Sequence, residues 1–151
     1  VRKKWPLVLT GHAGWQSEDI HQRIKHAERN GWARYLGYLP AKELPVIYSA
    51  SRLFVFPSHY EGFGLPVLEA MSSGIPVVCS NSSSLPEVVG DAALMSSPLD
   101  IFTLAEHIYK TLEDDVWRNT AIAKGGARAQ EFSWSKCARL TADVYKDLYK
   151  L

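Results

Sequence analysis

Apolar residues in this chain form short continuous runs that alternate with longer segments in which they recur every three or four residues. The short runs are typical of buried strands, and the longer segments are typical of amphipathic helices. Strands are expected at residues 6–10, 33–36, 53–56, 75–79 and 92–95. Helices are expected between them at residues 17–28, 43–50, 65–74 and 86–89. This alternation predicts an α/β fold with a doubly wound parallel sheet, in which ligands bind beyond the carboxyl ends of the strands.

The last third of the chain changes character and predicts helices alone. They are expected at residues 100–113, 115–131 and 133–149, each with a polar residue suited to capping its start. We expect them to pack over the sheet or onto a neighbouring domain. The sequence has no internal repeat and no linker, so residues 1–151 are predicted to form one domain.

Composition excludes several classes of protein. A net charge of +1, from 17 basic and 16 acidic residues, gives no general attraction for nucleic acid. The two cysteines, Cys79 and Cys137, lack the spacing of a metal site and predict reduced thiols in the cytoplasm. No apolar run approaches the roughly 20 residues of a membrane span. Peripheral contact with the inner face of a membrane, through a part outside this sequence, stays open.

The joint between the strand at 53–56 and the helix that starts at Leu65 carries the most specific chemistry. Gly62 and Gly64 allow a tight bend, and Pro66 suits the first turn of a helix. The amide groups of that first turn point back into the bend, where the helix dipole favours negative charge. This arrangement predicts a phosphate cradle that needs no metal.

Residues 61–71, Glu-Gly-Phe-Gly-Leu-Pro-Val-Leu-Glu-Ala-Met, resemble the E-x7-E motif of retaining glycosyltransferases with the GT-B fold, specifically family 4. Two glutamates at that spacing would be a weak signal alone, because 16 acidic residues produce such pairs by chance. Further matches follow in the family's order at residues 37–40, 56–58, 74–78, 85–93 and 132–134. The resemblance therefore covers nearly the whole chain and implies the Rossmann-like, C-terminal half of a GT-B fold, which binds the sugar donor.

Such a site should hold a nucleotide sugar by its pyrophosphate and leave the anomeric carbon open. The amides of Gly64, Leu65 and Val67 are candidates for the distal phosphate, because they lie at the positive end of the helix. Gly62 and Phe63 are expected to approach the donor sugar.

The resemblance gives the two glutamates different roles. It places Glu61 near the sugar hydroxyls or the developing positive charge, and Glu69 on the ribose hydroxyls. It also implies that Tyr38 and Leu39 offer backbone groups to the nucleobase. Simpler interpretations remain: Glu61 could only stabilise the helix dipole, Glu69 could be a solvated helix residue, and the turn at Tyr38 could serve packing.

Other polar residues near the motif have two interpretations each. His59 could contact phosphate or acceptor, or be structural. Residues 82–84, three serines, could border the donor pocket or cap the next helix. Gly11 could lie close to the donor, or belong to a turn against which Trp15 packs.

The family's second domain usually opens with a strand and helix that carry an arginine and a lysine for the pyrophosphate, and this sequence starts after them. Arg2, Lys3 and Lys4 precede the first strand and do not replace that pair. In the doubly wound order the absent strand lies between the strands at 6–10 and 53–56. We therefore expect a fragment of a longer enzyme, or another segment filling the gap, with no direct pairing of those two strands.

The resulting functional prediction is the donor-binding part of a retaining, metal-independent and cofactor-free transferase. It moves a hexose from GDP-mannose, or from UDP-glucose as the second choice, to a glycan or lipid-linked acceptor bound by an N-terminal domain. Alone, this chain is expected to be inactive. The alternatives are another GT-B enzyme, such as a glycogen synthase-like transferase or a nucleotide-sugar epimerase, and a non-catalytic nucleotide-sugar-binding module.

Overall fold

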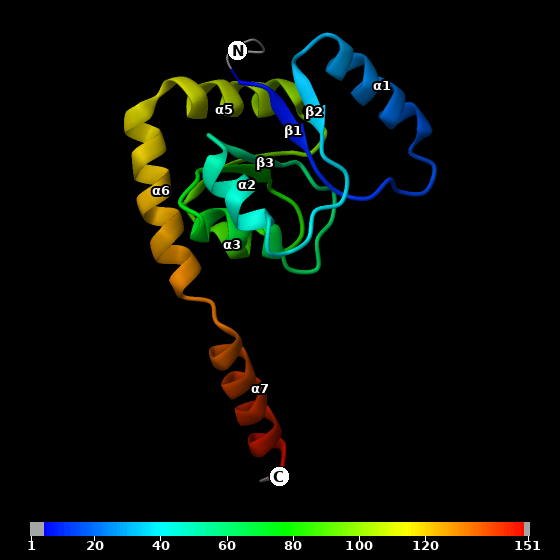
Figure 1. Ribbon diagram of the computed structural model, residues 1–151. Helices are drawn as coiled ribbons and strands as arrows, with labels where there is room; N and C mark the ends of the chain where they lie inside the picture. Colours follow the sequence, from blue (N-terminus) through cyan, green and yellow to red (C-terminus); the bar gives the residue numbers. More distant parts are fainter. Residues whose placement is uncertain (1–4, 150–151) are drawn as a thin grey trace. The chain divides into compact units, whose positions relative to one another are not determined.

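The computed structural model in Figure 1 describes residues 5–149. Arg2, Lys3 and Lys4 therefore lie outside the described residues. The chain divides into two compact units, Val1–Leu44 and Pro45–Leu151, and each is described by itself.

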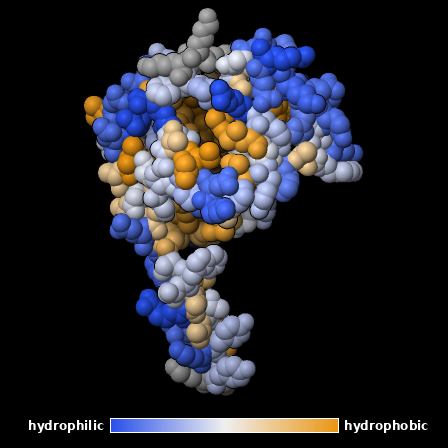
Figure 2. All heavy atoms as spheres, in the orientation of Figure 1, coloured by the Kyte–Doolittle hydropathy of each residue, from blue (hydrophilic) through white to orange (hydrophobic). Residues whose placement is uncertain are grey.

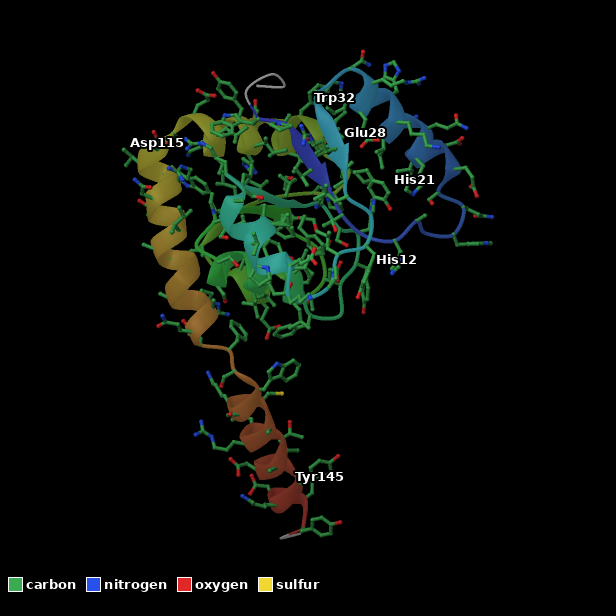
Figure 3. All side chains as sticks on the ribbon, viewed as in Figure 1. His12, His21, Glu28, Trp32, Asp115 and Tyr145 are labelled. Carbon is green, nitrogen blue, oxygen red and sulfur yellow. The ribbon has the colours of Figure 1, made fainter. Side chains whose placement is uncertain are left out.

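The first unit contains a single β-α-β arrangement. Strand β1 (Leu7–Leu9) pairs in parallel with β2 (Ala33–Tyr35), and helix α1 (Glu18–Arg29) connects them. The buried side of α1 carries Ala27, whereas its surface in Figure 2 is mostly hydrophilic. Glu28, labelled in Figure 3, accepts a 2.8 Å hydrogen bond from the amide of Tyr35 and so joins the helix to β2.

Ser17 precedes α1 and is of a residue type that often caps helices, but its side chain does not cap this one. Its hydroxyl donates a 2.6 Å hydrogen bond to the carbonyl of Gly14 instead. The reason lies in the backbone: Ser17 is not in the extended conformation that aims a capping oxygen at the first turn, and Gln16 before it has a φ of 53°.

The second unit contains a three-stranded parallel sheet in the order β3-β4-β5. Its strands are β3 (Phe54–Phe56), β4 (Val77–Ser80) and β5 (Ala93–Ser96). The helices before and between them are α2 (Leu44–Ala50), α3 (Leu65–Ser72) and α4 (Leu85–Val89), of which α2 begins at the boundary between the units. Phe54 pairs with Val77, and Val77 pairs with Ala93, so the carboxyl ends of all three strands lie at one edge.

Strand β4 is the centre of the core, because all four of its residues are buried. Helices α5 (Ile101–Glu113), α6 (Asp115–Gln130) and α7 (Trp134–Leu148) follow the sheet. Helix α5 packs on β4 and β5, and α6 packs on α3. The approach of α6 to α3 is close, since a Cβ at Gly125 would lie 3.2 Å from Cγ of Met71.

The polar caps predicted for the last three helices are confirmed. Asp100 accepts from the amide of Thr103, Asp114 from that of Trp117, and Ser133 from that of Lys136. Helix α7 differs from the other two because none of its residues is buried.

The α/β fold with parallel strands is confirmed. Among residues 5–149 the strands form two sheets, β1-β2 in the first unit and β3-β4-β5 in the second. Within the same residues, no helix combines the length and apolarity needed to cross a bilayer.

Candidate functional site

The predicted joint between a strand and a helix is present in the second unit. Helix α3 begins at Leu65, directly after Gly64, which has a φ of 110°. A Cβ at Gly64 would lie only 2.8 Å from Cδ2 of Leu85, a fully buried side chain. This position therefore requires glycine for its backbone conformation and for the space beside α4. Pro66 lies in the first turn of α3 as predicted.

Four consecutive residues at this bend have backbone amides without a protein acceptor in the described part of the chain, and Gly62, Phe63 and Leu65 are exposed whereas Gly64 is buried. The N–H groups of Gly62, Phe63, Gly64 and Leu65 donate to no acceptor within residues 5–149. Val67 differs, because its amide donates to the carbonyl of Gly64 at 3.0 Å and its side chain is fully buried. In this structure the amides free to bind an anion are thus those from Gly62 to Leu65, and the amide of Val67 is already paired.

Glu61 is held by serines through its backbone and its side chain. Ser58 donates a 2.7 Å hydrogen bond to Oε1 of the Glu61 carboxylate. The Glu61 amide donates to Oγ of Ser83 at 2.9 Å, and Oγ of Ser84 donates to the Glu61 carbonyl at 3.1 Å. Three hydroxyls from two loops therefore hold Glu61, one through its carboxylate and two through its backbone.

The end of β4 supports the same loop. The hydroxyls of Ser80 and Ser82 both donate to the carbonyl of Ser58. Ser83 has a φ of 52°, a left-handed conformation that is uncommon for serine and that accompanies its bond to the Glu61 amide. Neighbouring parallel strands that end at one edge bring these loops together.

From the sequence, residues 82–84 have two possible roles, bordering the donor pocket or capping the next helix, and nothing in it indicates their contacts with the Glu61 backbone. Residues 82–84 have the composition of a capping loop, yet Ser84 makes no side-chain cap to α4. Its hydroxyl instead donates to the carbonyls of Glu61 and Phe63. The feature of the sequence that could have indicated these contacts is that the serines directly follow β4, the strand next to β3.

Phe63 is placed by residues near the end of α6. Its ring meets Phe132 edge to face, with 5.8 Å between the ring centroids, and the Arg128 guanidinium lies 4.8 Å from the centroid of Phe132. Arg128 also donates to the carbonyls of Glu87 and Val88 in α4. The bend therefore rests on packing from α4 and from the segment after α6.

Glu69 lies on α3 and is exposed. Oε2 of its carboxylate accepts a 3.1 Å hydrogen bond from the hydroxyl of Tyr48 in α2. Burial, with the negative charge and hydrogen bond of Glu69, raises the pKa of Tyr48 to about 12. The sequence did not indicate that Tyr48 contacts Glu69, because Tyr48 belongs to no recognisable motif.

Tyr38 and Leu39 lie in the first unit, after β2. Tyr38 is exposed and stacks on His12, with 4.5 Å between the ring centroids and 16° between the planes, while Leu39 is half-buried. His12, labelled in Figure 3, follows β1. The amide of Gly11 donates to the carbonyl of Gly37 at 2.8 Å, which joins the carboxyl ends of β1 and β2.

His59 is exposed and has no side-chain hydrogen bond within residues 5–149. The same residues contain no group of three or more His, Cys, Asp or Glu side chains arranged to hold a metal ion.

The parallel strands joined by helices, with the N-terminus of α3 beside Glu61, define a doubly wound type of α/β domain. Residues 1–128 match the family model described as Glycosyl transferases group 1, and the chain belongs to this family. This match confirms the resemblance to the C-terminal domain of GT-B glycosyltransferases.

Individual proteins agree with the family match. The chain is 52% identical over 146 residues to the O-antigen chain mannosyltransferase B of Escherichia coli, covering 97% of this chain and 38% of that protein. The sucrose-phosphate synthase of Thermosynechococcus elongatus superimposes with a TM-score of 0.82 at 31% identity, covering 95% of this chain and 38% of the other. Anabaena HepE, solved in complex with UDP-glucose, gives a TM-score of 0.81 at 25% identity, with 94% and 41% coverage. The chain thus spans about two fifths of the length of these proteins.

Proposed function

We propose that this chain is the donor-binding part of a retaining, family 4 glycosyltransferase. The observation that carries the proposal is the row of four unpaired amides from Gly62 to Leu65 at the start of α3, next to the fixed carboxylate of Glu61. The amides are suited to the distal phosphate of a nucleoside diphosphate sugar, since the helix dipole favours negative charge there. Amides and basic side chains, rather than a divalent cation, would carry the phosphate charge.

The two glutamates have separate roles in this proposal. Glu61 stabilises the positive charge that develops at the anomeric carbon, an electrostatic effect that acts mainly in the transition state. Glu69 accepts hydrogen bonds from the ribose hydroxyls and so contributes to donor binding. Gly62 and Phe63 approach the donor sugar, and Tyr38 and Leu39 approach the nucleobase through backbone groups.

GDP-mannose is the favoured donor, and a glycan or lipid-linked sugar is the favoured acceptor. The mannosyltransferase of Escherichia coli that is 52% identical supports mannose. UDP-glucose is the second candidate, because HepE binds UDP-glucose in its solved structure. The acceptor would bind an N-terminal domain of the whole protein. The whole protein would lie in the cytoplasm, in peripheral contact with the membrane.

The test is a titration of the intact protein with GDP-mannose and UDP-glucose, followed by transfer to a fluorescent oligomannoside. We expect saturable binding of one donor and a product that keeps the anomeric configuration, seen by NMR. Activity should persist in a strong chelator. Loss of activity that added metal restores would contradict the metal-free mechanism, and donor binding without any turnover would favour a non-catalytic module.

The division between the glutamates has its own readout in the same assay. Glu61→Ala should lower kcat by a factor of about 100 or more, as for other groups that act on transition-state charge. Glu69→Ala should mainly raise the donor KM. Equal losses of donor affinity with unchanged turnover in both variants would refute the assigned roles.

A further inference from the structure

Tyr48 connects the hydrophobic core to the carboxylate of Glu69. Its ring packs edge to face on Phe54 of β3, with 5.3 Å between centroids and 86° between planes. The ring also packs against the buried cluster that includes Val77 and Leu85. At the other end, the hydroxyl reaches Oε2 of Glu69 at 3.1 Å. A rigid aromatic side chain thus extends from the core to a flexible, exposed carboxylate.

The direction of this hydrogen bond is fixed by chemistry. An ionised carboxylate only accepts hydrogen bonds, so Tyr48 is the donor. The pKa of Tyr48 is raised to about 12, mainly by burial, and the hydroxyl therefore keeps its proton at neutral pH. The bond removes freedom from glutamate, a side chain with high rotamer entropy.

The second oxygen of the same carboxylate has no assigned partner. Oε1 of Glu69 makes no hydrogen bond within residues 5–149, and the side chain is exposed on α3. One oxygen is therefore anchored while the other remains free to accept from a ligand.

We propose that Tyr48 is a positioning residue, which holds the Glu69 carboxylate in the orientation that accepts hydrogen bonds from the ribose hydroxyls of the donor. This inference rests on the proposed function, because it assigns Glu69 to the donor. It adds a residue outside the motif and predicts that removing one hydroxyl weakens donor binding without changing the chemical step.

The experiment uses the intact protein with Tyr48→Phe, Glu69→Ala and the double variant. GDP-mannose serves as substrate, while GDP and 2′,3′-dideoxy-GDP serve as binding probes in calorimetry. Tyr48→Phe should raise the donor KM and the Kd for GDP by a factor of about 3–10, the range expected for one hydrogen bond, and leave kcat within about twofold. The same change should have no effect on 2′,3′-dideoxy-GDP, which lacks the ribose hydroxyls.

The matched control is Tyr109→Phe, on the exposed surface of α5, where the hydroxyl makes no hydrogen bond within residues 5–149. It should leave the KM, the Kd and kcat unchanged. In the Glu69→Ala background, Tyr48→Phe should produce no further loss of GDP affinity. Thermal unfolding of every variant separates positioning from a loss of folded protein.

The outcomes separate the inference from the proposed function. Weaker binding in Glu69→Ala but normal binding in Tyr48→Phe would overturn only the role of Tyr48. Equal losses from Tyr48→Phe with and without Glu69, or for GDP and its dideoxy analogue alike, would also overturn it. Normal GDP affinity in Glu69→Ala would instead overturn the assignment of Glu69 to the donor, and the inference with it.

Discussion

Ser58 and Glu61 form a hydroxyl–carboxylate pair within one loop, with 2.7 Å between Oγ of Ser58 and Oε1 of Glu61. The backbone of this pair is also held, because the carbonyl of Ser58 accepts hydrogen bonds from the hydroxyls of Ser80 and Ser82. The orientation of the proposed catalytic carboxylate is thus set by side chains at the end of the neighbouring strand β4.

Ser58→Ala should lower kcat about tenfold and leave the donor KM within about twofold. A hydrogen bond to a charged group contributes roughly 1.5–3 kcal/mol, and here the loss falls on a group that is proposed to act in the transition state. The backbone contacts of Ser58 remain in this variant, so the protein should still fold, with an unfolding temperature lowered by the several degrees that the loss of this one hydrogen bond implies. Steady-state kinetics of the intact protein provide the measurement.

The control for this variant is Ser49→Ala. Ser49 is exposed on α2, and its hydroxyl bonds only to the carbonyls of Pro45 and Val46 in its own helix. It should leave kcat unchanged. An unaltered kcat in Ser58→Ala would mean that this hydrogen bond does not set the geometry of Glu61.

Gly64→Ala should destabilise the fold by about 2–4 kcal/mol. The new Cβ would be forced into a φ of 110° and would overlap Cδ2 of the buried Leu85 at 2.8 Å. Urea unfolding monitored by circular dichroism measures the loss.

Gly126→Ala is the matched control, since Gly126 lies within α6 with nothing within 4 Å of its added Cβ. That change should stabilise by about 0.5–1 kcal/mol, and equal effects at the two sites would contradict the geometry of the bend.

Arg128→Ala should reduce the free energy of unfolding by about 1–3 kcal/mol. It leaves the carbonyls of Glu87 and Val88 without their donor and removes the cation from the face of Phe132. Arg128→Lys should recover only part of the loss, because an ammonium cannot reproduce the two bonds of the planar guanidinium.

Lys124→Ala is the comparison for Arg128, measured by the same unfolding assay. Lys124 pairs with Asp91 at the surface, where this hydrogen bond holds the pKa of the Asp91 carboxyl below its usual range. Both groups are solvent-exposed, so the removal of this ion pair should change stability little. If Lys124→Ala lowered the free energy of unfolding more than Arg128→Ala, the hydrogen bonds from Arg128 to α4 would not be the larger contribution to stability, and the prediction would be wrong.

The two cysteines should react with alkylating reagents at very different rates. Cys79 is fully buried in β4, and burial raises the pKa of its thiol to about 12, so the reactive thiolate is scarce near neutral pH. Cys137 is exposed on α7. Peptide mass spectrometry after a maleimide pulse at pH 7.5 should find Cys137 labelled and Cys79 protected until urea is added. Equal labelling of both in the native protein would contradict the burial of β4.

The order of helices and strands could be predicted because each follows from local spacing. The expected strand at residues 53–56 is observed as Phe54–Phe56, and the helix expected from Leu65 is observed as Leu65–Ser72. The aspartate and serine caps of the last three helices were equally visible, since a cap depends on residues only three apart.

The features that the sequence did not indicate depend on contacts between segments distant in sequence or on exact backbone angles. Tyr48 and Glu69 are 21 residues apart, and no periodicity signals that their side chains meet. Ser17 satisfied the sequence rule for a cap, but the preceding turn at Gln16 directs its hydroxyl to Gly14. The roles given to the motif residues remain predictions.

The side-chain contact of Glu61 within residues 5–149 is a neutral hydroxyl, and no cation of those residues pairs with its carboxylate. An arginine or lysine in the same place would orient the carboxylate equally well but would cancel much of its field. Uncharged tethering keeps the full negative potential that the proposed role of Glu61 requires beside an electron-poor carbon, so replacing Ser58 by lysine should harm turnover more than replacing it by alanine.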